Sequence, residues 1–314
     1  MEKAPLVSIC MPAYNVDSFI EETIRSVISQ TFKNWELIIV DDGSTDSTPA
    51  ILSKTIDHRI TVLSPANQGA AAARNLAYQK SAGKYIVFFD ADDYMAPHFL
   101  ETQLAKSVET PNALIMSDWK RFNGEVPDKI LAEPVPFSEM YFDDWIAEYW
   151  YHCNPMTNPG RALIPRSVIE KAGNWNETLS LNDDLEFFTR IMLSADKIIF
   201  NHDAVLGYRS NGTGLSSSKK EESVNSLFKS IDLSVKMVLQ RYGEHELVRK
   251  SCANMWQSFI YITFPGYPDL VLEAQEKIHP IAKPDFKYPA GGVTRFLIYF
   301  LGWKLTRRLK TVFA

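Results

Sequence analysis

The chain has 314 residues, of which 46% are apolar, 23% charged and 12% aromatic, a composition typical of a folded globular protein. The formal net charge of −5 gives no general attraction for polyanions, which argues against a nucleic-acid partner. The three cysteines lie far apart in the sequence, which argues against a disulfide framework or a zinc site and favours a reducing compartment.

The apolar runs of the chain are short. The run before Pro12 is too short for a signal peptide, and none reaches the roughly 20 residues that a membrane-spanning helix needs. We therefore expect a cytoplasmic protein, with any membrane contact made from its surface at the inner face of the membrane.

Strand-length apolar runs alternate with segments of helical periodicity up to about residue 200. The first helix is predicted from Ile20, Ile24, Val27 and Ile28 on one face, with Asp17 as its cap. Further helices are expected at 69–81 and 97–108. The predicted strands are 6–11, 36–40, 60–63, 85–89 and 113–117. This order predicts a three-layer α/β nucleotide-binding domain with a mainly parallel sheet.

Beyond residue 218 the pattern becomes helical, with an apolar stripe from Val224 to Tyr242 and a second helix expected at 246–262. We therefore expect a catalytic domain at 1–218 and a helical region at 219–314. Its last segment, 294–314, combines aromatic and basic residues without an acid, which predicts a helix lying on an anionic membrane surface. Packing on the catalytic domain or on the partner in a homodimer is the alternative.

Three polar segments directly follow predicted strands, namely Ala13-Tyr14-Asn15, Asp41-Asp42-Gly43 and 90–93. Because ligands of open α/β sheets bind beyond the carboxyl ends of the strands, we expect these segments to converge on one rim. Carboxylates there suit a divalent cation that neutralises two phosphates. An isolated acidic turn ahead of Pro97 is the alternative interpretation of 90–93.

The segment 67–75 joins a glycine turn to a helix of small residues that contains Arg74. A guanidinium at this point can contact phosphate or base with directional hydrogen bonds, whereas a packed helix with a surface arginine is the alternative. Together with this segment, the acids after the strands favour a site for a nucleotide with two phosphates.

Four ordered motifs, VSICMPAYN (7–15), IIVDDGSTD (38–46), NQGAAAARN (67–75) and YIVFFDADD (85–93), closely resemble glycosyltransferase family 2, a large family of inverting enzymes. The resemblance covers about residues 5–210 and includes LNDDLEFFTR (181–190). It implies a nucleoside pocket after the first strand, a base contact at Asp42, a ribose contact near Asp90, and Mn²⁺ or Mg²⁺ held mainly by Asp92, with Asp93 as a second candidate. The donor-binding residues expected are Pro12, Ala13, Tyr14, Asn15, Asp41, Asp42, Gln68, Gly69, Arg74, Asp90 and Ala91.

Members of this family usually carry a Glu-Asp pair whose aspartate deprotonates the acceptor; the pair here is Asp183-Asp184. We expect Asp184 to be the base and Asp183 to support it, although either acid can take either place. Both also suit the start of an amphipathic helix. Where many relatives have a histidine, this chain has Asn211, so no third protein ligand is assigned. The glycine- and serine-rich segment 208–218 is either a loop that closes over the donor or a plain linker.

The resemblance implies transfer of a sugar from a nucleotide-diphospho donor by a single displacement with inversion. A UDP-sugar is the default donor by family frequency, and the acceptor would be a saccharide or lipid-linked saccharide in bacterial-type polysaccharide or glycolipid synthesis. Two other classes of protein fit the sequence less well. A nucleotidyltransferase would carry a glycine-rich basic loop after its first strand, where this chain has AYNV (13–16). A catalytically silent nucleotide-sugar-binding protein would have no need of acids at Asp92 and Asp184.

Overall fold

The structure, a computed structural model, describes residues 4–108, 110–127, 130, 132, 135–155, 157–210 and 220–312, with side chains to residue 309. The chain divides into two compact units, one of Met1–Phe142 and Thr157–Ser226, the other of Asp143–Met156 and Leu227–Ala314. The short segment from Asp143 thus packs with the helical unit, although it lies inside the sequence range expected for the catalytic domain. The functional boundary expected after residue 218 stays a prediction.

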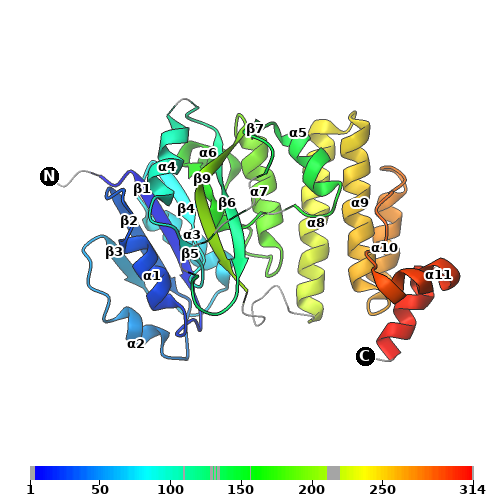
Figure 1. The fold of residues 1–314 in the computed structure, drawn as a ribbon, viewed down its shortest axis with the longest axis horizontal. Helices are drawn as coiled ribbons and strands as arrows, with labels where there is room; N and C mark the ends of the chain where they lie inside the picture. Colours follow the sequence, from blue (N-terminus) through cyan, green and yellow to red (C-terminus); the bar gives the residue numbers. More distant parts are fainter. Residues whose placement is uncertain are drawn as a thin grey trace. The chain divides into compact units, whose positions relative to one another are not determined.

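The strands of the first unit form one nine-stranded sheet among the described residues, in the order β3-β2-β1-β4-β8-β6-β9-β5, with β7 beside β9 (Figure 1). β1, β2, β3 and β4 are mutually parallel, as are β6 and β9, whereas β8 is antiparallel to both of its neighbours. The predicted α/β fold with a mainly parallel sheet is confirmed. The strands are β1 (Val7–Ala13), β2 (Trp35–Asp41), β3 (Ile60–Leu63), β4 (Tyr85–Phe88), β5 (Tyr94–Met95), β6 (Leu114–Phe122), β7 (Glu139–Met140), β8 (Ala162–Pro165) and β9 (Ile198–Arg209).

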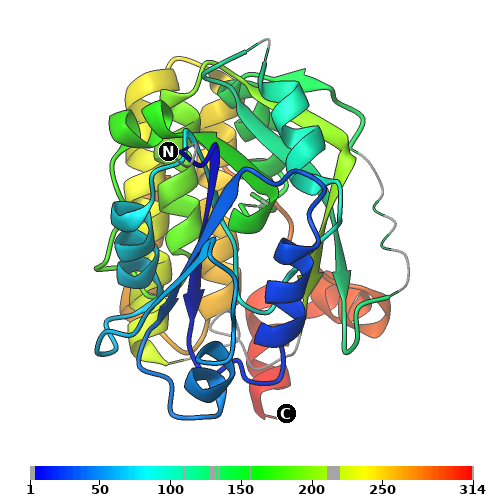
Figure 2. The same ribbon diagram turned by 90° about the vertical axis from the view of Figure 1, so that its left-hand side faces the viewer.

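Helices cover both faces of this sheet, and α1 and α3 lie on opposite sides of it (Figure 2). The helices predicted at 69–81 and 97–108 are α3 and α4. The helices of the first unit are α1 (Ile20–Ile28), α2 (Thr48–Leu52), α3 (Ala70–Lys80), α4 (Phe99–Ser107), α6 (Arg166–Ala172) and α7 (Asp183–Ser194), with a short 3-10 helix at Pro159–Arg161. The short helix α5 (Phe142–Trp145) begins at the boundary between the units.

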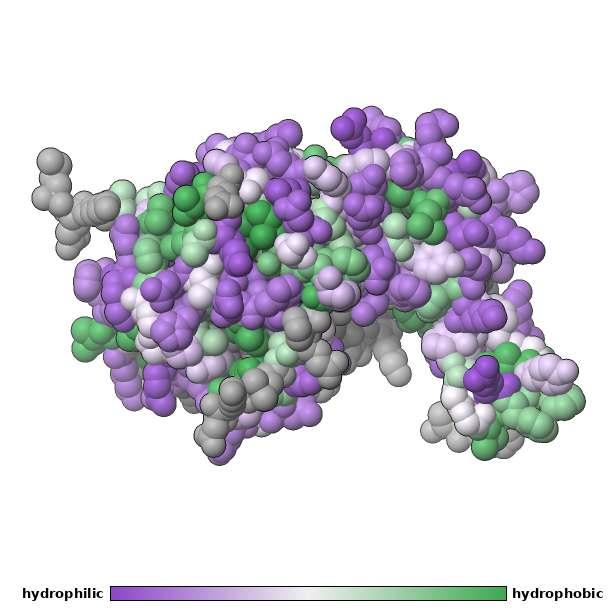
Figure 3. Space-filling model, turned by 45° about the horizontal axis from the view of Figure 1, so that its top comes forward, coloured by the Kyte–Doolittle hydropathy of each residue, from purple (hydrophilic) through white to green (hydrophobic). Residues whose placement is uncertain are grey.

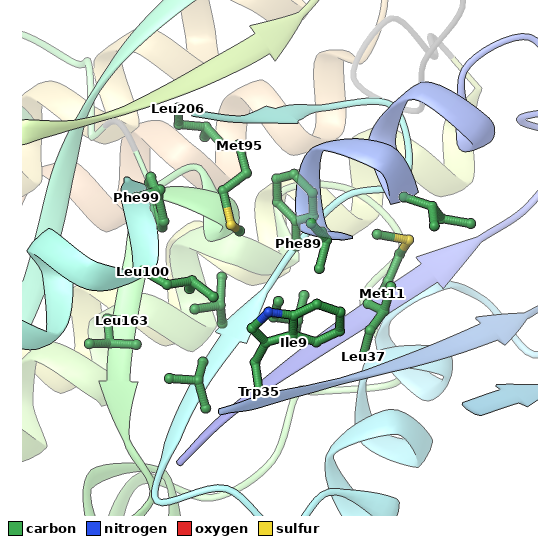
Figure 4. Packing of buried hydrophobic residues seen from close by; sticks show 14 of the residues in the cluster. Ile9, Met11, Trp35, Leu37, Phe89, Met95, Phe99, Leu100, Leu163 and Leu206 are labelled. Atoms are coloured by element: carbon green, nitrogen blue, oxygen red, sulfur yellow. The ribbon is translucent and has the colours of Figure 1, made fainter. Parts of the chain in front are cut away.

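The main core lies between the sheet and α1. Ile9 and Met11 of β1 point into it beside Leu37, Phe89 and Trp35 (Figure 4). Successive side chains of a strand point to opposite faces, so alternate apolar residues reach this core and those between them reach the other face. Each fully buried side chain of this size contributes about 1.5–3 kcal/mol to folding. The strands are therefore anchored on both faces, which fixes where their carboxyl ends lie.

Asp17 is not the cap of α1, contrary to the prediction. The helix begins at Ile20, and its N-cap residue, Phe19, makes no side-chain capping bond. The Asp17 carboxylate instead accepts hydrogen bonds from the backbone N–H of Ser47, at 3.3 Å, and from the Ser18 hydroxyl, at 3.2 Å. The carboxylate of Asp17 is therefore bonded to the loop after β2 and does not cap the helix.

The second unit is helical, as the sequence pattern predicts. Trp145 and Trp150 are 0% and 1% exposed, so these aromatics belong to its core. Asn254 of α9 holds the segment beside them, because its amide donates to the Tyr151 carbonyl at 2.9 Å. Within the described residues, no helix is long and apolar enough to cross a membrane. The helices are α8 (Glu221–Tyr242), α9 (Glu246–Thr263), α10 (Pro268–Ile278), α11 (Gly292–Val312) and a π-helical turn at Ile146–Trp150.

Candidate active site

The polar segments after β1, β2 and β4 leave the sheet at one edge. Ala13 is paired with Asp41 at the ends of β1 and β2, and Cys10 is paired with Phe88 on the other side of β1. Because these strands are parallel neighbours, the segments that follow them start next to one another, as the sequence pattern predicts. Side chains from three distant parts of the sequence therefore meet at this edge.

Asp42 anchors the loop that leads into α3. Its two carboxylate oxygens accept the backbone N–H groups of Gln68 and Gly69, each at 2.8 Å, and its carbonyl accepts the Asn67 amide at 2.7 Å. Gly69 has φ 94°, a conformation that favours glycine, and an added Cβ would meet nothing within 4 Å, so the backbone angle is what requires glycine here. Carboxylate oxygens can accept more than one hydrogen bond, so this arrangement is compatible with the expected contact to a base.

Asn15 and Asp41 hold the neighbouring loop after β2. The side-chain oxygen of Asn15 accepts the Thr45 N–H at 2.8 Å, and the backbone N–H of Asn15 donates to the Ser44 hydroxyl at 2.9 Å. Asp41 accepts the Ser44 N–H at 3.1 Å. Of the segment expected to line the nucleoside pocket, Tyr14 is 50% exposed, which leaves its ring free to stack on a planar ligand. Ala13 is buried beneath it and Pro12 is half-buried.

Arg74 links the end of β4 to the start of α7. Its two terminal nitrogens donate to Asp90 at 2.9 Å and to Asp183 at 3.0 Å, and the guanidinium lies 4.5 Å from the centre of the Trp175 ring. The arginine is only 8% exposed. The sequence predicts that this guanidinium contacts phosphate or base. In the structure, both of its terminal nitrogens bond carboxylates. Charge-assisted bonds in a buried place are strong, so the residue fixes the spacing of the two acids.

Asp183 and Asp184 lie in the first turn of α7, where the helix dipole favours negative charge. The Thr157 hydroxyl donates to Asp184 at 2.9 Å. Burial, and after it the charge of Asp183, raise the pKa of Asp184 to about 6. A carboxylate with such a pKa is ionised at neutral pH yet accepts a proton more readily than an ordinary aspartate. Sequence reasoning missed Thr157, which lies in an irregular segment 27 residues before Asp184 and in no recognisable motif.

The aspartates after β4 differ in exposure. Asp92 is partly exposed, whereas Asp93 is completely buried and accepts the backbone N–H of Arg209 at 3.0 Å through one oxygen. Its other oxygen is buried without a hydrogen-bond partner. Burial, and after it the charges of Asp90 and Asp92, raise the pKa of Asp93 well above its ordinary value. Ala91 is buried between them. Asp92 is thus the acid of this pair that a ligand at the surface can reach.

These residues fit a divalent cation that arrives with a diphosphate. Among the described residues, no three metal-binding side chains gather at one place. Mg²⁺, however, is commonly held by one or two carboxylates together with substrate phosphates and water, and Asp92 at the surface suits such a site. Asp93 would have to leave its buried position to contribute. Asn211 and the part of the proposed closing loop at 211–218 lie outside the residues that the structure describes.

Comparison with known proteins bears on the same part of the chain. The family described as glycosyl transferase family 2 matches residues 8–173. A protein named as an uncharacterized glycosyltransferase from Haemophilus influenzae is 43% identical over 116 residues, which cover 36% of this chain and 46% of that protein. The putative teichuronic acid biosynthesis glycosyltransferase TuaG of Bacillus subtilis is 39% identical over 145 residues, covering 45% of this chain and 56% of that protein. The chain thus spans about half the length of these curated relatives.

A third relative is the Escherichia coli UDP-Glc:alpha-D-GlcNAc-diphosphoundecaprenol beta-1,3-glucosyltransferase WfgD, 37% identical over 119 residues, 38% of this chain and 47% of that protein. Among solved structures, residues 1–349 of S. aureus TarS in complex with UDP-GlcNAc match with a TM-score of 0.71 and 21% identity, covering 87% of this chain and 80% of that one. This likeness shows a shared fold. Because the family match extends over more than half of the 314 residues, the chain belongs to glycosyl transferase family 2.

Proposed function

We propose that the protein is an inverting glycosyltransferase that moves a sugar from a UDP-sugar to a hydroxyl of a saccharide or lipid-linked saccharide. The observation that carries the proposal is the bridge from Asp90 through Arg74 to Asp183, because it joins the donor-side acids to the acid pair in the first turn of α7. The name of WfgD specifies a UDP-sugar donor and a lipid-diphosphate-linked acceptor, and the TarS structure was determined with UDP-GlcNAc, which supports this choice of substrates.

In the proposed reaction the acceptor oxygen attacks the anomeric carbon from the side opposite the diphosphate. The bond from that carbon to the diphosphate oxygen breaks, and its electron pair stays on the diphosphate. The proton of the acceptor hydroxyl passes to Asp184, which the Thr157 hydroxyl orients. The charge of Asp183 raises the proton affinity of Asp184, while Arg74 keeps Asp183 in place.

A divalent cation, Mn²⁺ or Mg²⁺, would be held by Asp92 and would supply stabilisation of the charge that develops on the diphosphate. Tyr14 offers a surface for the base, and Asp42 holds the loop beside it. These roles for individual residues are part of the proposal.

The tuned acid pair argues against a silent binding protein, because donor binding alone does not require an aspartate of raised pKa oriented by a hydroxyl. The general test is a hydrolysis screen of UDP-, GDP- and dTDP-sugars with Mn²⁺ or Mg²⁺. Release of the nucleoside diphosphate from one class of donor is the expected result. Turnover of none of them, with or without a range of saccharide acceptors, would contradict the proposed reaction.

The first prediction concerns Asp92→Ala. The variant should fold normally, because the side chain is partly exposed, but it should lose the cation-dependent part of its affinity for UDP. Calorimetric titration of UDP with and without Mn²⁺ measures this part directly. If Mn²⁺ strengthens UDP binding equally in the variant and the wild type, Asp92 is not a cation ligand.

The second prediction compares Asp184→Asn with Asp183→Asn. The first should bind donor normally but lose about a hundred- to ten-thousandfold in the rate of transfer, because an amide cannot accept the proton. In the wild type, transfer should rise with pH through about 6 as Asp184 ionises. In Asp183→Asn the effect on rate should be milder and the rise should move to lower pH, because the charge that raises the pKa is gone. Single-turnover transfer across pH decides this, and a reversed ranking would give the base role to Asp183.

The third prediction concerns stability. The pKa of Asp184 rises from 3.8 to about 6 on folding, so its favourable contribution exists at low pH and is lost as pH rises through about 6. At pH about 8, Asp184→Asn should therefore be more stable than the wild type by about 1–3 kcal/mol, and the difference should shrink toward pH about 4. Urea unfolding at several pH values tests this, with Asp269→Asn in the first turn of α10 as an exposed control. Equal stabilities at every pH would contradict the buried, ionised state proposed for Asp184.

We also propose that the C-terminal helix α11 contacts an anionic membrane surface. At Gly302, with φ 71°, the helical conformation is interrupted. After the break, Trp303 packs on Tyr261 with ring centres 4.8 Å apart. Before it, Phe296, Tyr299 and Phe300 are 64%, 83% and 65% exposed, and apolar atoms are visible on the surface of this segment at the lower right of Figure 3. From residue 286 onward the chain has six basic residues and no acid. Exposed aromatic residues beside basic ones are the features that bind anionic bilayers.

The fourth prediction is that replacing Phe296, Tyr299 and Phe300 together by serine reduces binding to vesicles that contain phosphatidylglycerol at least about tenfold, because the aromatic area that enters the bilayer is lost. Cosedimentation measures the bound fraction. The control replaces Ile56 and Leu272, which are 97% and 57% exposed, by serine. Equal partitioning of all forms would exclude the membrane. A wild-type dimer that the aromatic substitutions dissociate would identify a second copy of the chain as the partner.

A further inference from the structure

Arg209, the last residue of β9, is a buried arginine at the turn that carries Asp92. Its Nε donates to the backbone carbonyl of Asp92 at 2.8 Å, and its two terminal nitrogens donate to the carbonyl of Gly124 and to the carboxylate of Glu22. Its own backbone N–H donates to the Asp93 carboxylate at 3.0 Å. The arginine side chain is 2% exposed, whereas that of Glu22 is 40% exposed. A guanidinium so deeply buried requires this complete set of partners.

Aromatic rings enclose the same guanidinium. The rings of Phe19 and Phe122 have their centres 4.9 Å and 4.5 Å from it, which excludes water and strengthens its hydrogen bonds. Arg209 also lies at the end of β9, which pairs with β5 directly after the acidic turn. The side chain is therefore held by aromatic contacts and ion pairing in a single orientation toward the Asp92 carbonyl.

Thr23 of helix α1 and Gln30, two residues after the end of this helix, hold the segment after Asp92 by further hydrogen bonds. The Thr23 hydroxyl donates to the Asp93 carbonyl at 2.9 Å, and the Gln30 amide donates to the Ala96 carbonyl at 2.8 Å. Glu22 precedes Thr23 on helix α1 and bonds Arg209 of β9, which in turn bonds the Asp92 carbonyl. Helix α1 is therefore connected to the acidic turn through Arg209 as well as directly. The turn is thus held from two sides, and Glu22 is the one exposed member of the charged pair.

We propose that Arg209 and Glu22 are positioning residues that fix the Asp92 turn, so that the Asp92 carboxylate faces the donor diphosphate and its cation. Neither residue touches the substrate in this role. Arg209 acts through the peptide carbonyl of Asp92, and Glu22 acts by holding the guanidinium. The inference rests on the proposed function for its ligand, but the ordering of the turn is a property of the free protein.

Glu22→Ala removes the ion pair without creating a buried cavity, because the Glu22 side chain is partly exposed. The control is Glu21→Ala, its neighbour in the first turn of α1, whose 72% exposed side chain pairs with Arg25 at 2.9 Å and not with the acidic turn. In the absence of ligand, hydrogen exchange in the segment 90–95 should become faster in Glu22→Ala and stay unchanged in Glu21→Ala. The Asp93 N–H, which donates to the Asp90 carbonyl at 3.2 Å, is the most direct reporter.

Calorimetry with UDP supplies the second readout. The strengthening of UDP binding by Mn²⁺ should fall about tenfold in Glu22→Ala, the effect of losing one charge-assisted hydrogen bond, while binding without Mn²⁺ stays unchanged. Arg209→Lys, which keeps the charge but loses the forked geometry, should show the same loss if its melting temperature shows that it folds. Wild-type exchange together with a wild-type Mn²⁺ effect in Glu22→Ala would overturn the inference. A wild-type protein that does not bind UDP with Mn²⁺ would instead contradict the proposed function, and the exchange experiment would still decide the role of the pair.

Discussion

The arrangement of the acids at the carboxyl edge of the sheet, Asp90 and Asp183, depends on one buried cation, Arg74. Asp90 and Asp183 come from positions 93 residues apart in the chain and would repel each other if both were ionised without a partner. The guanidinium bonds both, and the Trp175 ring covers it at 4.5 Å. Trp175 in turn stacks on Phe187 of α7 with ring centres 4.0 Å apart. The aromatic layer therefore holds the arginine, and the arginine holds Asp90 and Asp183. Its charge also counteracts part of the rise in the pKa of Asp184.

Burial raises the pKa of both Asp93 and Asp184, but the two acids differ in exposure and in hydrogen-bond partners. Asp93 is fully enclosed and is held in place as a structural acceptor of the Arg209 N–H. Asp184 is half-buried, accepts a hydrogen bond from the Thr157 hydroxyl and has its pKa raised to about 6. Two aspartates with the same intrinsic chemistry thus differ in accessibility because the fold buries them to different degrees.

Much of the fold follows from local patterns. β3 occupies the residues expected for it, and α3 is shorter than expected by one residue at each end. Such agreement arises because apolar alternation and helical periodicity are properties of short segments. The acids and Arg74 are also recognisable from the motifs that carry them. What the patterns could not reveal depends on contacts between distant residues. Thr157 bonds Asp184, 27 residues away, and Arg209 bonds Asp93, more than 100 residues away. Asp17 bonds the loop after β2, 30 residues further on, and for this reason does not cap α1.

Helix α3 connects two groups of hydrogen bonds in the site. Asp42 accepts the backbone N–H groups of Gln68 and Gly69, the two residues directly before this helix, and Arg74, one turn into the helix, bonds Asp90 and Asp183. The loop that Asp42 holds and the acids that Arg74 bonds are therefore connected through one helix of 11 residues. A change in the position of α3 would alter both sets of hydrogen bonds together.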